Sequence, residues 1–79
     1  MNKNLFESKW KQIRSQIPGW WSLISDQDLN KVDKADSKFN KFVTMLQVKY
    51  GYTREQAIKE TGNHVEKYES EQKTGVTFV

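Results

Sequence analysis

The 79-residue chain contains no cysteine, which excludes disulfides and thiolate metal sites. It has a single histidine, His64, and a metal-binding or acid–base role would require suitable partners around it. We expect His64 to be an exposed or capping residue near Glu60. The four glycines are scattered, so no Gly-rich phosphate loop is present. The sequence therefore favours a non-enzymatic protein without catalytic residues, cofactor or metal.

Long hydrophobic runs are also lacking. A secretory signal contains an apolar run of roughly 7–15 residues, but Glu7, Lys9 and Lys11 interrupt the first segment of this chain. No window approaches the ~20 apolar residues of a membrane span. We therefore expect a soluble, cytoplasmic protein with no membrane contact. The length favours one domain, which we expect to be a monomer.

Positive charge is in mild excess and unevenly placed. The formal net charge is +3 and the sequence pI is about 9.2. The excess lies before Trp20, and the rest of the chain is balanced. This basic segment and one exposed tryptophan predict a binding surface that includes Lys3, Lys9, Lys11, Arg14 and Trp20. Weak nucleic-acid binding is the alternative function that this surface would support.

Apolar residues at helical spacing predict the first helix from an Asn4 cap to Ile17. Its buried stripe comprises Phe6, Trp10, Ile13 and Ile17. We expect Pro18-Gly19 to end it, because proline lacks the backbone donor that the next turn needs. A single turn should follow around the adjacent Trp20 and Trp21. One of these two rings should be buried and the other partly exposed, and the sequence does not say which.

Two further helices are indicated by their caps. Ser25 and Asp28 form a capping box before a short helix that should bury Leu29 and Val32 and end within residues 33–35. Asp36 or Ser37 should cap the next helix, which should run to Tyr50. Its apolar stripe comprises Phe39, Phe42, Val43, Met45, Leu46 and Tyr50. Gly51 can then adopt the left-handed conformation that often closes a helix.

The stretch "VKYGYTREQAIKE", residues 48–60, could be a recognition loop or a joint between two helices. We favour the joint, because Thr53 and Gln56 form a second capping box and Tyr52 can pack against Ala57 as a staple. The last helix should start at Thr53 and bury Ala57, Ile58, Thr61 and Val65. It should bend or end at Gly62. We predict a single helical domain over residues 1–68 and a polar, flexible tail over residues 69–79.

Two motif interpretations have little support. Four carboxylates lie close together in sequence: Asp26, Asp28, Asp33 and Asp36. Asp26 and Asp28 begin the alternating ligand pattern of a calcium loop, but the turn glycine and the closing glutamate are missing. Capping and solubility explain these carboxylates better. The segment around Gly62 loosely fits a helix-turn-helix motif. The glutamates of its second half would repel phosphate, which argues against DNA binding there.

Three elements together resemble the CsbD-like family of small bacterial stress-associated proteins. They are "WKQI" at Trp10–Ile13, the apolar cluster at Trp21–Ile24 with the "SDQDL" that follows it, and "LQVKYGYTREQAIKE" at Leu46–Glu60. The third is the most specific, and the resemblance covers residues 8–66. Family members usually carry Gly-Lys pairs where this chain reads "RSQIPGWW" and "DKADSKFNK", and residues 32–38 look about one helical turn longer. The chain therefore resembles a divergent member.

The resemblance implies a small all-α bundle of four to five helices, arranged as two roughly orthogonal helical hairpins of the SAM-domain-like type. It also implies a bacterial protein associated with the general stress response. It supplies no catalytic residue or cofactor. We therefore expect a protein that acts by binding, with a protein partner that the sequence does not name.

Overall fold

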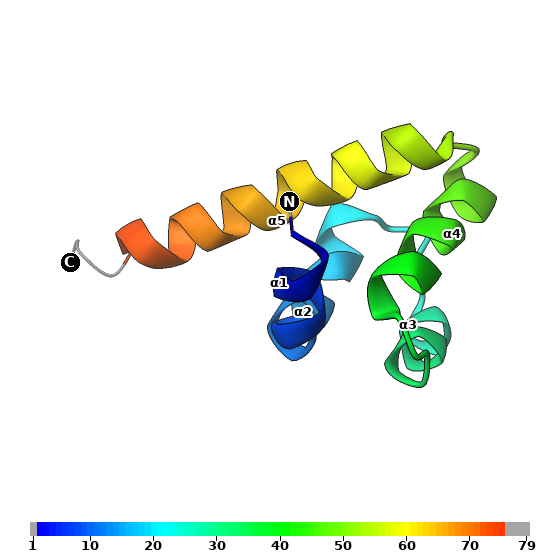
Figure 1. Cartoon of the computed structure of the whole chain (residues 1–79), viewed down its shortest axis with the longest axis horizontal. Coiled ribbons are helices and arrows are strands. Elements are labelled where there is room, and N and C mark those ends of the chain that lie inside the picture. The colour runs from blue at the N-terminus through cyan, green and yellow to red at the C-terminus, as the bar shows by residue number, and fades with distance from the viewer. Residues whose placement is uncertain (1, 76–79) are drawn as a thin grey trace.

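Five helices follow one another along residues 2–75, the part of the chain that the computed structural model describes (Figure 1). In chain order they are α1 (Lys3–Ser8), α2 (Trp10–Trp20), α3 (Asp26–Asp33), α4 (Lys38–Tyr50) and α5 (Arg54–Gly75). Residues 2–75 contain no strand. The prediction of a small all-α bundle is therefore confirmed.

The first predicted helix is divided in two. Asn2, not Asn4, is the N-cap, and its side chain accepts a hydrogen bond from the Asn4 N–H at 2.7 Å. The helix breaks at Lys9, whose φ of −107° and ψ of 18° are not helical. The apolar spacing could not reveal this break, because α1 and α2 both bury residues of the predicted stripe, beginning with Phe6 in α1.

Pro18 lies inside α2, so the prediction that the helix ends at Ile17 is wrong. The helix continues to Trp20, and the Trp21 N–H donates to the Ile17 carbonyl at 2.8 Å. Pro18 removes one backbone donor from the last turn of α2. The burial of Ile17 and Trp21 on either side of it offsets this loss.

The caps of α3 and α4 agree with the sequence. Both hydrogen bonds of the Ser25–Asp28 capping box form, and Ser37 caps α4. α4 ends at Tyr50, where Gly51 adopts the left-handed conformation with a φ of 71°. The predicted joint is confirmed, since residues 51–53 connect α4 to α5 and Thr53 accepts from the Gln56 N–H at 3.0 Å.

α5 runs without interruption from Arg54 to Gly75, so the predicted bend or end at Gly62 does not occur. A glycine inside a helix costs about 1 kcal/mol relative to alanine. Burial of Thr61 and Val65 beside it offsets that cost, and the Thr61 hydroxyl also donates to the Ala57 carbonyl at 2.8 Å. Ile58 is 40% exposed, so its predicted burial is wrong.

α5 lies across the other helices and extends beyond α1 and α2 in the view of Figure 1. The helix continues into residues 69–75, which we expected to be a polar tail, while residues 76–79 lie outside the described part. There the Lys9 ammonium is 3.0 Å from a Glu69 carboxylate oxygen. The division into a domain of residues 1–68 and a flexible tail stays a prediction.

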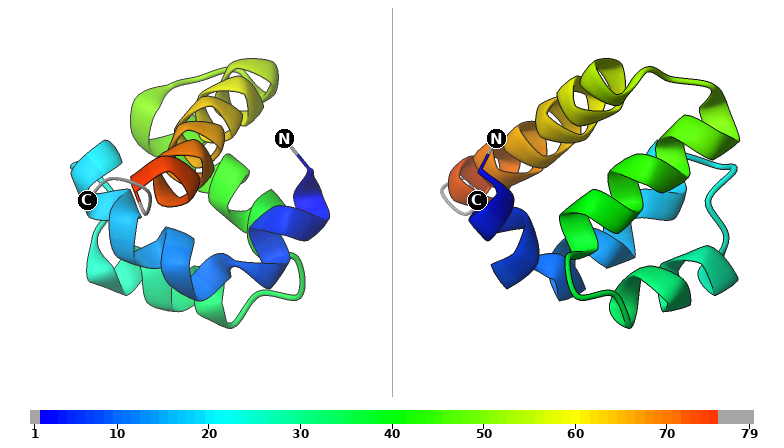
Figure 2. Two further views of the ribbon diagram at one scale, coloured as in Figure 1. Left: turned by 90° about the vertical axis from the view of Figure 1, so that its left-hand side faces the viewer. Right: turned by 45° about the vertical axis from the view of Figure 1, so that its right-hand side comes forward.

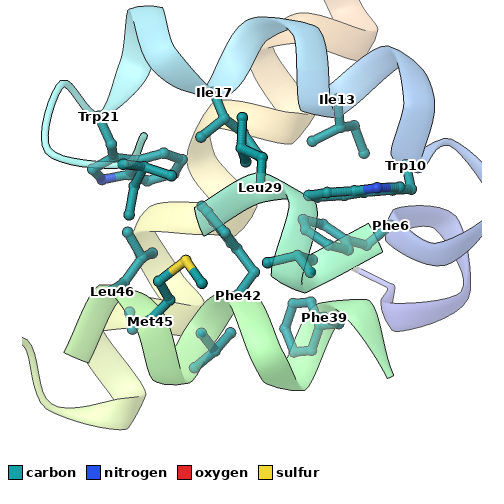
Figure 3. Close-up of a cluster of buried hydrophobic side chains, with 14 of the residues drawn as sticks. Phe6, Trp10, Ile13, Ile17, Trp21, Leu29, Phe39, Phe42, Met45 and Leu46 are labelled. Atoms are coloured by element: carbon teal, nitrogen blue, oxygen red, sulfur yellow. The ribbon is translucent and has the colours of Figure 1, made fainter. Parts of the chain in front are cut away.

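α4 is the central helix of the bundle. It contacts α1, α3 and α5, and Figure 2 shows α4 and α5 as a hairpin around their joint. In the core, Phe6 of α1 meets two rings of α4, with centroids 5.4 Å from Phe39 and 5.8 Å from Phe42 (Figure 3). Trp21 contacts the Phe42 ring from the α2–α3 connection, at 5.3 Å. The aromatic side chains therefore join segments that are far apart in sequence.

Candidate functional site

The predicted basic surface is partly neutralised by acidic residues. Lys9 pairs with Glu69, and the Arg14 Nε lies 3.1 Å from an Asp33 oxygen. Arg14 also donates to the Asn30 side chain at 2.9 Å. Lys3 and Lys11 are exposed. Two of the four predicted cations therefore hold helices together, which reduces the attraction of this face for phosphate.

Asp33 links α3 to α2. It accepts a hydrogen bond from the Trp10 indole N–H at 2.6 Å in addition to its contact with Arg14. The pKa of Asp33 is lowered, chiefly by the Trp10 hydrogen bond and further by the nearby Arg14 charge. Asp33 therefore has a structural role between helices that the expected roles in capping and solubility did not include.

The two adjacent tryptophans divide as predicted. Trp21 is buried, with 3% of its surface exposed, and Trp20 is half-buried. Trp20 stacks on the His64 imidazole at 5.1 Å with an interplanar angle of 24°. Its ring also meets Tyr68 edge-on at 6.0 Å. One face of the predicted contact ring is therefore covered by a side chain of the same protein.

His64 is not simply an exposed or capping residue. It is half-buried, and its ring also meets Trp21 edge-on at 4.7 Å. This packing could not be predicted from the sequence, because it depends on how α5 crosses the end of α2. His64 thus belongs to an aromatic cluster with Trp20, Trp21 and Tyr68.

A hollow of about 190 Å³ lies beside this cluster. It is lined by Gln16, Trp20, His64, Lys67, Tyr68 and Glu71. We call it the aromatic hollow. Its lining carries one cation and one carboxylate, so it has no pronounced charge preference.

A larger hollow of about 290 Å³ lies between α3 and α4. Asp28 and Lys31 line it from α3. The α4 side chains that line it are Lys41, Thr44, Met45, Val48 and Lys49. We call it the α3–α4 hollow. Sequence reasoning missed it, although one signal was present: Val48 is an apolar residue outside the buried stripe, between two lysines of the same helix.

Asp28 is the one acidic residue in the α3–α4 hollow, and it is already engaged. It closes the capping box of α3, and one of its oxygens lies 3.0 Å from the Lys49 ammonium. The pKa of Asp28 is lowered, chiefly by the Ser25 backbone N–H and further by Lys49. The carboxylate is therefore ionised at neutral pH, as a capping role requires.

The acidic residues do not assemble a metal site within the described part of the chain. No group of three or more His, Cys, Asp or Glu side chains that could hold a metal ion occurs in residues 2–75. In the same residues, no helix is long and apolar enough to cross a membrane. The arrangement offers two small hollows, one aromatic and one with an excess of lysines.

Comparison with known proteins places the chain in a family. No model of a known protein family matches it, and no solved structure does. It is 32% identical to a UPF0337 protein of Protochlamydia amoebophila over 68 residues, which cover 86% of this chain and 98% of the relative. It is also 35% identical to a UPF0337 protein of Pseudomonas aeruginosa over 60 residues, or 76% of this chain and 88% of that protein.

The UPF0337 protein YjbJ of Escherichia coli K12 is 32% identical over 60 residues, which cover 76% of this chain and 83% of YjbJ. These matches extend over most of the chain and most of each relative. They agree with the resemblance that the tryptophan and "YGYTREQA" elements indicated. The chain therefore belongs to the CsbD-like UPF0337 family, as a divergent member.

Proposed function

We propose that the protein acts by binding, not by catalysis, in the general stress response of the bacterial cytoplasm. Membership of the CsbD-like family supports the stress role, since that family is stress-associated. The placement of the carboxylates supports the binding role. Asp28 closes the capping box of α3 and Asp33 holds α3 to α2, so both carboxylates with lowered pKa values have structural roles.

The observation that carries the proposal is the α3–α4 hollow. Val48 is 78% exposed, more than Leu23 or Ile58, and it lies beside Met45 in a concave surface. Single exposed aliphatic residues are common on proteins. Val48 differs because it adjoins a second apolar side chain in a hollow with three lysines. Protein contact surfaces have an apolar core and a polar rim, and the α3–α4 hollow has this arrangement on a small scale.

Nucleic-acid binding by the predicted basic surface has weaker support. Lys9 and Arg14 are engaged with Glu69 and Asp33, so fewer cations are available to release counterions from phosphate. His64 covers one face of Trp20, which limits base stacking on that ring. We therefore place the binding surface at the α3–α4 hollow.

A complementation experiment tests this proposal. A deletion strain would be exposed to osmotic, ethanol and heat stress after it receives the wild-type gene or one of two variants. Val48→Asp puts a charge into the α3–α4 hollow, and Ile58→Asp makes the matched change at an exposed aliphatic residue of α5. We expect the wild type and Ile58→Asp to restore survival, and Val48→Asp to fail at a normal protein level.

Normal survival of the deletion strain under every stress would contradict the stress role. Full rescue by Val48→Asp would contradict the assignment of the function to the α3–α4 hollow. Circular dichroism of the purified variants would show that all of them are folded.

A further inference from the structure

The α3–α4 hollow has a row of side chains along one helix. Lys41, Met45 and Lys49 are spaced four residues apart on α4, so they lie one above another on the same face. The two lysines are therefore separated by about 12 Å along the helix axis. Val48 adjoins this row, and Lys31 contributes from α3. An apolar centre thus lies between positive groups.

The charges of the α3–α4 hollow do not cancel. Three lysines face a single carboxylate, Asp28, and Lys49 occupies that carboxylate at 3.0 Å. Lys31 and Lys41 remain as surplus positive charge. An occupant of complementary charge must therefore carry carboxylates or other anionic groups.

The apolar part of the surface limits the type of occupant. Met45 is nearly buried, with 9% exposed, whereas Val48 is 78% exposed. An aliphatic side chain placed against them would remove apolar surface from water. The α3–α4 hollow offers no aromatic ring for a nucleobase to stack on. At about 290 Å³ it is also at the small end of the range for sites that enclose a drug-sized ligand.

We propose that the α3–α4 hollow binds an acidic segment of a partner protein. One aliphatic side chain of the segment packs against Val48 and Met45, and its carboxylates lie near Lys31 and Lys41. This inference rests on the proposed function, because it names the class of partner for the same surface. It makes the lysines and Val48 specificity-determining residues.

The test is a titration of the isotopically labelled full-length protein, followed by the backbone amide NMR signals. The probe is a short peptide with a single leucine among glutamates. Two matched peptides replace the leucine by serine or the glutamates by lysines. We expect the first peptide to shift the amides of α3 and α4 around Lys31, Met45 and Val48. Binding should weaken as salt rises, because exposed charge pairs are screened.

Variants of the protein then separate the apolar contribution to binding from the contribution of the lysines. Val48→Ser should weaken binding of the leucine peptide about five- to tenfold, and the matched Ile58→Ser should leave it unchanged. Lys31→Gln and Lys41→Gln should each weaken it about threefold. The serine peptide lacks the aliphatic side chain that packs against Val48. Its affinity for the wild type should therefore be no higher than the affinity of the leucine peptide for Val48→Ser.

Several results would overturn the acidic-segment assignment. They are equal binding of the leucine and serine peptides, shifts confined to other surfaces, equal shifts with a short oligonucleotide, and loss of the same amide signals by self-association alone. If Val48→Asp fails to rescue the deletion strain and any of these results is also found, the acidic segment is rejected as the occupant and the proposed function is retained. Full rescue by Val48→Asp would reject both.

Discussion

The indole N–H of Trp10 donates a hydrogen bond to Asp33 at 2.6 Å, across 23 residues of sequence. Asp33 accepts from Arg14 as well, so one carboxylate at the end of α3 joins two side chains of α2. Trp10 itself is buried beneath this contact. The pair therefore connects the aromatic core to the surface charges between α2 and α3.

Asp33→Asn should destabilise the fold by about 1 kcal/mol at pH 7, because a partly exposed charged acceptor is lost. The pKa of Asp33 is lower in the folded protein than in the unfolded chain, where it is about 3.9. Its contribution is thus present above that value and lost as pH falls through the folded pKa. Urea unfolding of wild type and variant should differ at pH 7 and converge in acid.

The control for this prediction is Asp36→Asn, an exposed aspartate just before α4. It should change the free energy of unfolding by no more than about 0.5 kcal/mol. An Asp33→Asn variant that is as stable as wild type at pH 7 would show that the negative charge of Asp33, beside Trp10 and Arg14, does not stabilise the fold.

Gly51 and Gly19 form a matched pair. A Cβ atom at either position would meet no atom within 4 Å, but Gly51 alone of the two has a positive φ, of 71°. Gly51→Ala should therefore destabilise by about 1 kcal/mol or more, while Gly19→Ala in α2 should stabilise by up to about 1 kcal/mol. Thermal melts would measure both, and equal melting temperatures would argue against the left-handed turn.

The adjacent tryptophans should respond differently to truncation. Trp21→Ala opens a cavity in the core and should destabilise by about 3–5 kcal/mol, enough to unfold much of the protein. Trp20→Ala removes a half-buried ring and should cost only about 1–2 kcal/mol. Denaturant unfolding of both variants would show this order. A larger loss for Trp20→Ala would mean that the two rings have exchanged places.

A chain that ends at Tyr68 tests the predicted domain of residues 1–68. Its folding should remain cooperative, and the free energy of unfolding should fall by about 1 kcal/mol or less, because the Lys9–Glu69 pair is a surface ion pair. Glu69→Gln in the full-length chain separates the loss of that pair from the loss of helix length. Non-cooperative unfolding of the shortened chain would extend the domain into residues 69–75.

Local features of the fold could be predicted from the sequence. The Ser25–Asp28 capping box, the Ser37 cap and the Gly51 turn each depend on hydrogen bonds or backbone angles within a few residues. The apolar stripe of α4 follows from helical spacing alone. Two features could not be predicted from local sequence: the break at Lys9 and the uninterrupted course of α5 through Gly62. Both depend on packing between distant segments, which outweighs the small free-energy cost of the local conformation.

The candidate site depended more on tertiary structure. The sequence identified lysines, an exposed tryptophan and a histidine, but it could not pair Lys9 with Glu69 across 60 residues or place His64 on Trp20. It also could not show that Lys31 and Val48 line one hollow. The sequence by itself determined the family, the caps of α3 and α4 and most of the core, because these depend on residue type and short spacing. Only the tertiary structure decided which charges are neutralised and which apolar residue stays exposed, because both depend on how the helices cross.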